Sequence, residues 1–204
     1  MVSQFTAVGG GVASLDSLQG IGTEANPASD NVALSTVDEY GTAIDTYTWN
    51  TWAAAAPCWV NDSYEPVTGV TIAPGQAFWT TGASDDQSIQ STGEVGVEDV
   101  VVSLRLGYTL VGNPFPVKIA LQDLVAESSD EETAAASDNV AISTIDEYGT
   151  AIDTYTWNTW AAAEPCWVND SYEPVNGVEF APGEGLWASG TSEAQSIRFP
   201  APEL

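Results

Sequence analysis

The sequence predicts an all-β protein made of two tandem β-sandwich modules of jelly-roll or immunoglobulin-like size, and three observations lead to this prediction. First, the segment from Asp30 to Val67 returns from Asp138 to Val175, shifted by 108 residues and changed at only three positions. Second, short segments rich in β-branched and aromatic residues recur roughly every eight to twelve residues. Third, Gly, Pro, Asn and Asp separate these segments, as in sandwiches and small barrels.

The repeat also predicts the domain organisation. A period near half of the 204 residues gives two small domains, residues 1–93 (module 1) and residues 94–204 (module 2). Two of the three exchanges within the repeated block, Leu34 for Ile142 and Val37 for Ile145, keep side-chain volume and apolar character. Interior positions tolerate such exchanges best. We therefore expect an internal duplication in which each copy packs its own core.

Each copy opens with an apolar segment and a short turn. Residues 5–9 align with residues 108–112, which places Met1 opposite Leu104. Leucines three apart follow, Leu15 and Leu18 in module 1, and this spacing suits a single helical turn better than a strand. Leu121 and Leu124 repeat the pattern in module 2.

The repeated block is predicted to begin with a β-hairpin. Residues 32–37 and 43–50 alternate in the manner of strands, and Gly41 between them can adopt positive φ in the turn. The Ala-rich tract that follows is short and ends in Pro57, so we expect a loop or one turn there. Further strands are expected at residues 58–61, 67–72, 76–81 and 88–91, with counterparts 108 residues later.

The charge balance restricts the partners. There are 29 acidic residues against three basic ones, Arg105, Lys118 and Arg198, and no His, for a net charge of −26. Such a surface repels phosphate backbones and anionic headgroups, so we expect neither nucleic-acid binding nor membrane insertion. It should instead gather cations, whether screening salt or Ca²⁺. A saline habitat would explain the acidity equally well, and then the charge says nothing about function.

The setting is expected to be extracellular or the cell surface, although the sequence starts without the basic and apolar layout of a secretion leader. No apolar run approaches the roughly 20 residues that cross a bilayer. Cys58 and Cys166 occupy equivalent positions in the two copies. They are interpreted as small buried residues, while a bridge between the copies or between molecules stays open.

A strongly β-prone segment lies between the copies. Its candidate assembly residues are Val97, Val100, Val101, Val102, Leu104 and Leu106. It leads directly into module 2, and by the alignment above module 1 lacks such a strand. An unpaired strand edge is a template for another chain, so we expect the segment to be shared with module 1 or donated to a neighbouring molecule. The alternative is that it pairs within its own chain.

Module 2 carries a recognisable pattern. Residues 107–116 read GYTLVGNPFP, and residues 181–187 read APGEGLW, with Trp157 and Trp167 between them. This resembles a repeat module of secreted bacterial surface proteins. Module 1 has Gly9, Gly10 and Gly11 in place of the GNPFP turn. The resemblance implies a β-sandwich accessory or structural module and brings no catalytic residues with it.

The sequence offers few of the side chains that enzyme active sites commonly use. Without His there is no imidazole base and no serine protease triad, and one Cys per copy cannot build a thiolate zinc site. A carboxylate pair for glycoside hydrolysis is the remaining enzyme hypothesis, but Asp38 and Glu39 are adjacent and would point to opposite faces of a strand. We therefore expect a protein that is not an enzyme and that requires no cofactor.

Calcium is the candidate ion. The NDSYE segments place oxygen ligands at alternate positions of a turn, with Asp62 and Glu65 in module 1 and Asp170 and Glu173 in module 2. The alternative is a solvated Asx turn. The pairs Asp30 with Asn31 and Asp138 with Asn139, together with Asp45 and Asp153, are candidates to complete these sites.

The eight Trp residues favour cores, interfaces or sugar stacking. Trp52 and Trp160, next to the Ala tracts and outside the strand alternation, are expected to be exposed for a ligand or an interface. The leading functional prediction is a structural protein that self-assembles into an extracellular filament, sheath or array through strand-edge pairing, with itself as the partner. The alternative is a carbohydrate-binding or adhesive module pair that uses the exposed Trp side chains on a polysaccharide.

Overall fold

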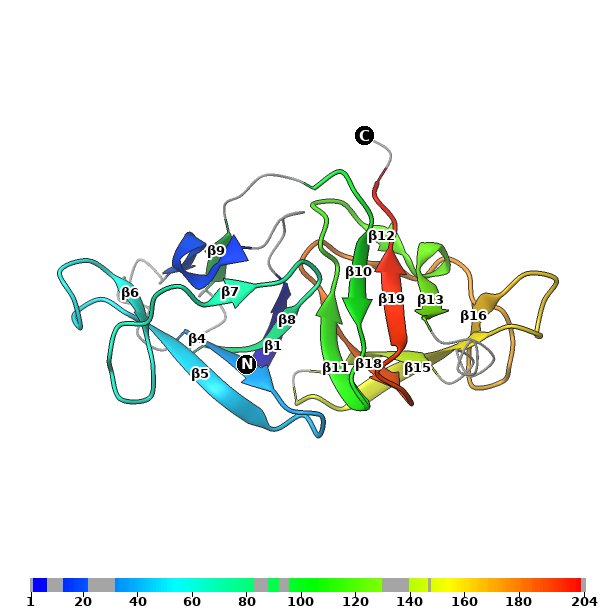
Figure 1. The fold of residues 1–204 in the computed structure, drawn as a ribbon, viewed down its shortest axis with the longest axis horizontal. Coiled ribbons are helices and arrows are strands. Elements are labelled where there is room, and N and C mark those ends of the chain that lie inside the picture. The colour runs from blue at the N-terminus through cyan, green and yellow to red at the C-terminus, as the bar shows by residue number, and fades with distance from the viewer. Residues whose placement is uncertain are drawn as a thin grey trace.

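The computed structural model describes residues 2–6, 13–21, 32–82, 88–91, 96–129, 140–146 and 148–202. The described residues form β-strands and two short 3-10 helices, without an α-helix among them (Figure 1). Every pairing between the named strands is antiparallel. The predicted all-β class is confirmed.

Each module contains a five-stranded sheet with the same order of strands. In module 1 the order is β1 (Val2–Thr6), β8 (Ala77–Thr81), β4 (Ala33–Val37), β5 (Ala43–Asn50) and β6 (Cys58–Val60). In module 2 it is β11 (Gly107–Gly112), β18 (Gly185–Gly190), β14 (Ala141–Ile145), β15 (Ala151–Asn158) and β16 (Cys166–Val168). The repeated block therefore builds the same three strands, β4 to β6 and β14 to β16, in both places.

The predicted hairpin is present in both modules. In the hairpin turn of module 1, Gly41 has φ +82° and donates its N–H to the Asp38 carbonyl at 3.1 Å. Gly149 has φ +83° at the equivalent position of module 2. The Asp38 carboxylate accepts from the N–H groups of Tyr40 and Thr42 at 2.9 and 2.8 Å. An L-residue at either glycine would be strained, so the turn depends on glycine.

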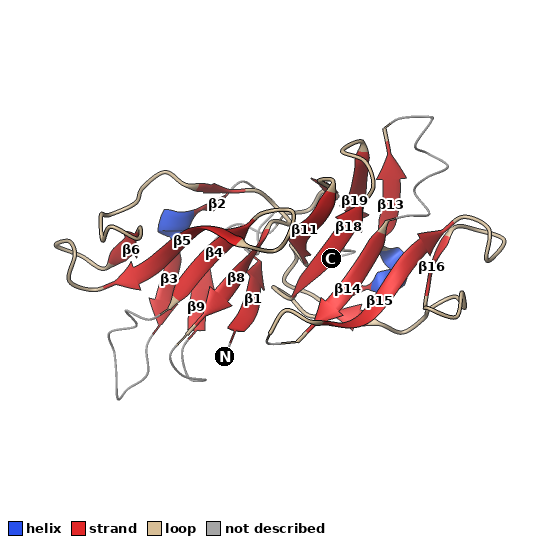
Figure 2. Ribbon diagram, turned by 90° about the horizontal axis from the view of Figure 1, so that it is seen from below, coloured by secondary structure: helices blue, strands red, loops and turns tan. Residues whose placement is uncertain are grey.

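Smaller strands cover one face of each sheet (Figure 2). In module 1, β3 (Leu18–Ile21) pairs with β9 (Ser88–Ser91). In module 2 the equivalent pair, β13 (Val125–Ser128) and β19 (Gln195–Phe199), is joined by β10 (Val100–Ser103) on the other edge of β19. The remaining elements are β2 (Ala13–Ser14) on β7 (Thr71–Ile72), β12 (Ile119–Ala120) on β17 (Glu179–Phe180), η1 (Leu15–Ser17) and η2 (Leu121–Asp123).

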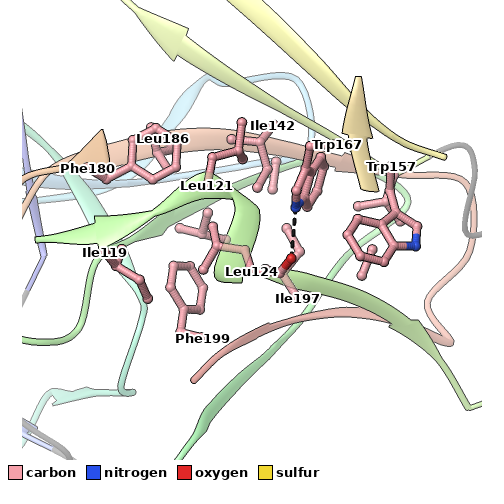
Figure 3. Close-up of a cluster of buried hydrophobic side chains, with 14 of the residues drawn as sticks. Ile119, Leu121, Leu124, Ile142, Trp157, Trp167, Phe180, Leu186, Ile197 and Phe199 are labelled. Atoms are coloured by element: carbon pink, nitrogen blue, oxygen red, sulfur yellow. Dashed lines mark hydrogen bonds between the residues drawn. The ribbon is translucent and has the colours of Figure 1, made fainter. Parts of the chain in front are cut away.

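The core of each module lies between these layers, and an indole hydrogen bond ties it together. In module 2, Trp167 is 1% exposed and donates its Nε1–H to the Leu124 carbonyl at 2.8 Å (Figure 3). In module 1, Trp59 makes the same bond to Leu18 at 2.9 Å. The predicted helical turns are present as η1 and η2. They bury Leu15 and Leu121, and each ends at the leucine, Leu18 or Leu124, whose carbonyl accepts the indole hydrogen bond.

Two predicted strand segments are shorter than expected. Within residues 67–72 only Thr71–Ile72 is a strand, because Gly69 adopts φ +74° and interrupts the extended backbone. Within residues 97–106 only Val100–Ser103 is a strand. After it, Leu104 is buried and Gly107 turns the chain into β11 with φ +93°.

The predicted alignment of the opening strands is wrong by three residues. Backbone pairing sets Phe5 opposite Phe78, whereas Val111 is opposite Leu186, the counterpart of Phe78. Phe5 therefore corresponds to Val111 and not to Tyr108, since sheet register follows the pairing partner. The Gly9–Gly11 segment, on which the comparison of the first loops depended, lies outside the described residues.

Candidate functional site

An exposed pair of stacked aromatic rings lies at each end of the molecule, and these pairs are the candidate site. In module 1, Trp52 and Tyr64 are 64% and 61% exposed, and their ring centroids are 5.7 Å apart with an interplanar angle of 28°. In module 2, Trp160 and Tyr172 are stacked at 6.0 Å and 30°. We call these pairs the terminal platforms, because the β6 and β16 ends that carry them lie farthest apart (Figure 1).

A buried asparagine fixes the Trp of each terminal platform. Asn50, at the end of β5, is 1% exposed, and its Oδ1 accepts from the N–H groups of Trp52 at 2.9 Å and Ala53 at 2.6 Å. Asn158 does the same for Trp160 and Ala161. The Ala-rich tract is a loop, as predicted, and its start is held by the core.

The Tyr of each terminal platform is held in an unusual backbone conformation. Tyr64 and Tyr172 both have φ +60°, and no other described residue except glycine has positive φ. The Tyr64 N–H donates to the Asn61 carbonyl at 2.9 Å, and the Asn61 Oδ1 accepts from the N–H groups of Ser63 and Glu65. A bulky side chain in this region costs on the order of 1 kcal/mol, and such strain concentrates at functional positions.

The predicted calcium ligands lie in this same turn. Asp62 and Glu65 are exposed, as are Asp170 and Glu173 in module 2. The Asn61 Oδ1 is engaged by main-chain N–H groups, as in an Asx turn, the alternative interpretation of this motif. Among the described residues, no group of three or more acidic, Cys or His side chains is arranged so that it could hold a metal ion. Asp30, Asn31, Asp138 and Asn139, which were candidates to complete these sites, lie outside the described residues. Calcium binding stays a prediction.

The predicted assembly strand has a partner within its own chain. Val100 to Ser103 pair with Phe199 to Ser196 on β19, and the Leu104 N–H donates to the Gln195 carbonyl at 2.9 Å. Val100 and Leu104 are buried in module 2, and Val102 packs against its core, whereas Val97, Val101 and Leu106 are exposed. Residues 100–103 therefore pair within their own chain, which is the alternative to donation given above.

Sequence reasoning missed a second aromatic cluster, where the two modules meet. Trp187 of β18 lies against Gly41, and Trp79 of β8 lies against Gly149, so each module places a Trp on the hairpin turn of the other. The Tyr108 N–H donates to the Glu39 carbonyl at 3.1 Å across the same junction. A signal existed: glycine follows an exposed tyrosine in both hairpin turns. Nothing in the sequence indicated that the turns would meet the other module's Trp.

Two of the three basic residues are neutralised by carboxylates. Arg198 bonds Glu127 at 2.6 Å and Asp99 at 3.2 Å, and Lys118 bonds Glu179 at 2.9 Å. Hydrogen bonding to Glu179 raises the pKa of Lys118, and hydrogen bonding to Glu127 raises that of Arg198. Arg105 instead donates from Nη2 to the main-chain oxygens of Val37, at 3.1 Å, and Tyr108, at 3.5 Å. This side chain therefore ties the modules together.

The two cysteines are free and half-buried at the start of β6 and β16. No disulfide joins the copies, and pairing between molecules stays a prediction. Among the described residues, no helix is long and apolar enough to span a membrane. Comparison of the chain with family models, curated proteins and solved structures gives no match. The resemblance to surface-protein repeat modules therefore stays a prediction too.

Proposed function

We propose that this chain is a non-enzymatic adhesive protein that holds an uncharged polysaccharide at both ends, through the terminal platforms. The observation that carries the proposal is the exposed Trp–Tyr stack that recurs in both copies. An exposed pair of large rings contributes little to the core, yet a buried Asn and a positive-φ Tyr hold it in place. Aromatic faces held rigidly in water suit the flat apolar faces of sugar rings.

The charge of the chain narrows the ligand. A net charge of −26 disfavours acidic glycans, so neutral chains are the expected class. Asp62 and Glu65 are exposed in the same turn as Tyr64, and their carboxylates can accept from sugar hydroxyls; the same residues recur in module 2. A protein with such a site at each end would bridge chains on a surface, which fits an extracellular setting.

Binding to insoluble neutral polysaccharides tests the proposal. Two sites on one molecule bind a polymer more tightly than either alone, so Trp52→Ala or Trp160→Ala should weaken retention about 100-fold, and the double variant should abolish it. Ile44→Ala and Ile152→Ala are matched controls, because they remove exposed apolar side chains at equivalent positions away from the platforms. Retention of the double variant at wild-type level would refute the proposal.

A second candidate function is self-assembly into an extracellular filament, sheath or array. It is favoured by one specific observation: β19 has partners on both edges, whereas β9 pairs only with β3 among the described residues. An edge open in this way accepts a strand from another molecule. Residues 100–103 of a neighbouring molecule would supply that strand by strand exchange, after separating from β19 of their own chain.

Hydrogen exchange and electron microscopy test assembly. If β9 accepts a strand, amides of Ser88–Ser91 should gain protection as protein concentration rises, and polymers should be visible. Adding or chelating calcium in the same samples tests the predicted ion, since screening of the acidic surface should promote association. Exchange at β9 that does not depend on concentration, in samples without polymers, would rule out this candidate.

A further inference from the structure

An aromatic cleft of about 430 Å³ lies at the junction of the two modules, and neither proposed function uses it. Its volume is within the range of small-molecule sites. Module 1 contributes its hairpin turn and β8, and module 2 contributes β11, β14, β15, β18 and its own hairpin turn. The cleft therefore exists only where the copies meet.

Five aromatic side chains line this junction cleft: Tyr40, Trp79, Tyr108, Tyr148 and Trp187. The rings of Tyr108 and Trp187 stand edge to face, with centroids 5.6 Å apart and planes inclined by 61°, so they form a corner. The rest of the lining consists of glycine, alanine and the hydroxyl residues Ser143, Thr154 and Ser189. Among the residues that the structure describes, this lining contains no charged side chain.

The rings are held by close contacts with the opposite module. A Cβ on Gly149 would come within 2.9 Å of the Trp79 ring, and one on Gly41 within 3.2 Å of the Trp187 ring. Both glycines have positive φ, so substitution there would be strained as well as crowded. The cleft is thus preformed, because its walls are part of the junction.

The electrostatic setting of the junction cleft favours a cation. The face of an aromatic ring attracts positive charge, and the surrounding chain carries a net charge of −26. Arg105 donates to the main-chain oxygen of Tyr108 at 3.5 Å, but it lines a neighbouring cavity and not this one. A calcium ion would need six to eight oxygen ligands, whereas the described lining offers mainly ring faces and a few hydroxyls.

We propose that the junction cleft binds an organic cation of the alkylated ammonium class, with its methyl groups against the ring faces and its charge balanced by the acidic surface. Trp187 and Tyr108 form the corner that receives the ammonium. Trp79 and the tyrosines of the two hairpin turns complete the cage. This site does not depend on the terminal platforms.

Calorimetric titration of the full chain with choline tests the proposal. The comparison ligand is 3,3-dimethylbutan-1-ol, which has the shape of choline but no charge. A cation–π site should bind choline about tenfold more tightly than the alcohol, and the affinity should fall as salt is added. Equal binding of the two ligands, or no binding of choline, would overturn the proposal.

Variants locate the bound cation. Tyr40→Leu and Tyr148→Leu change side chains that are 80% exposed, so the fold should survive, and choline affinity should fall several-fold in each. Tyr108→Leu, which removes one side of the corner, should have the largest effect. Trp160→Leu at a terminal platform is the control and should leave choline affinity unchanged. A loss in the control with none in the cleft variants would also overturn the proposal.

Discussion

Module 1 and module 2 build the same five-stranded sheet from the repeated block, and they differ in what covers it. Both sheets carry the same register shift, between Ser35 and Val37 in one and between Ser143 and Ile145 in the other. Both bury an indole that donates to a leucine carbonyl. The covering layer has three strands in module 2, but only two in module 1 among the described residues.

The difference extends into the cores. The module 2 core includes Phe115 from the turn after β11, and Phe199 and Leu104 from the β10–β19 layer. Among the described residues, the module 1 core is a smaller cluster under β3 and β9, which contains Leu34, Trp59 and Phe78. Because burial of apolar surface dominates stability, we expect Phe115, Phe199 and Leu104, all outside the repeated block, to contribute strongly to the stability of module 2.

The largest expected effect on stability comes from a substitution that disrupts the three-stranded layer of module 2, formed by β10, β19 and β13. Phe199 is fully buried on β19, so Phe199→Ala should lower the free energy of unfolding of module 2 by about 3–5 kcal/mol. Amides of β13 and β19 should lose protection against hydrogen exchange, while those of β4 and β5 change less.

Val101→Ala is the control for this prediction. Val101 lies on β10 but is 53% exposed, so its substitution should change stability by less than about 0.5 kcal/mol. If Phe199→Ala cost under about 1 kcal/mol, the β10–β19 layer would not be what distinguishes the modules.

A smaller effect tests one matched position where the modules differ. Gly20 on β3 corresponds to Ala126 on β13, since each is opposite the equivalent residue of the partner strand, Ile89 or Ile197. A Cβ on Gly20 would lie 2.7 Å from the Trp49 ring. Gly20→Ala should therefore destabilise module 1 by about 1–3 kcal/mol through overpacking, despite the usual preference of strands for Ala over Gly.

The reverse substitution completes this comparison. Ala126 is buried in the module 2 core, so Ala126→Gly should cost about 1 kcal/mol through chain entropy and lost contacts. Urea unfolding of both variants measures the two changes. If Gly20→Ala stabilised module 1, the Trp49 side chain would be able to shift and make room for the added methyl group. Both modules would then tolerate alanine at this position, and the prediction would be wrong.

Local patterns in the sequence predicted local structure well. The hairpin around Gly41, the helical turn at Leu15 and the exposure of Trp52 all follow from short-range rules of turn chemistry and periodicity. Their counterparts in module 2 follow from the repeat.

Long-range pairing was less predictable. The register of β1 depends on its partner β8, and the position of β10 depends on β19, which is far along the chain. The junction cleft depends on how Trp187 meets Gly41, a contact between modules that no periodicity encodes. The β propensity of residues 100–103 is visible in the sequence, but their pairing with β19, almost 100 residues later, is not.

The smallest expected effect is electrostatic and involves the start of β10, which module 1 lacks among its described residues. The Ala201 N–H, at 2.8 Å, and the Arg198 guanidinium lower the pKa of the Asp99 carboxyl. The folded state therefore favours the carboxylate. The stabilisation is present above about pH 4, the usual pKa of Asp, and is lost as pH falls through the lowered pKa. Asp99 is exposed, so the effect on global stability should be slight and should appear mainly in local contacts.

The amide chemical shift of Ala201 reports this titration directly. In the wild-type chain it should change with a midpoint below the usual pKa of Asp, because the N–H loses its charged acceptor as Asp99 is protonated. In Asp99→Asn the amide oxygen still accepts the hydrogen bond, but the charge is gone, so the titration should vanish while β10 stays paired with β19. A transition that persists in Asp99→Asn would assign it to another carboxyl, and the link between Asp99 and the third strand of module 2 would be wrong.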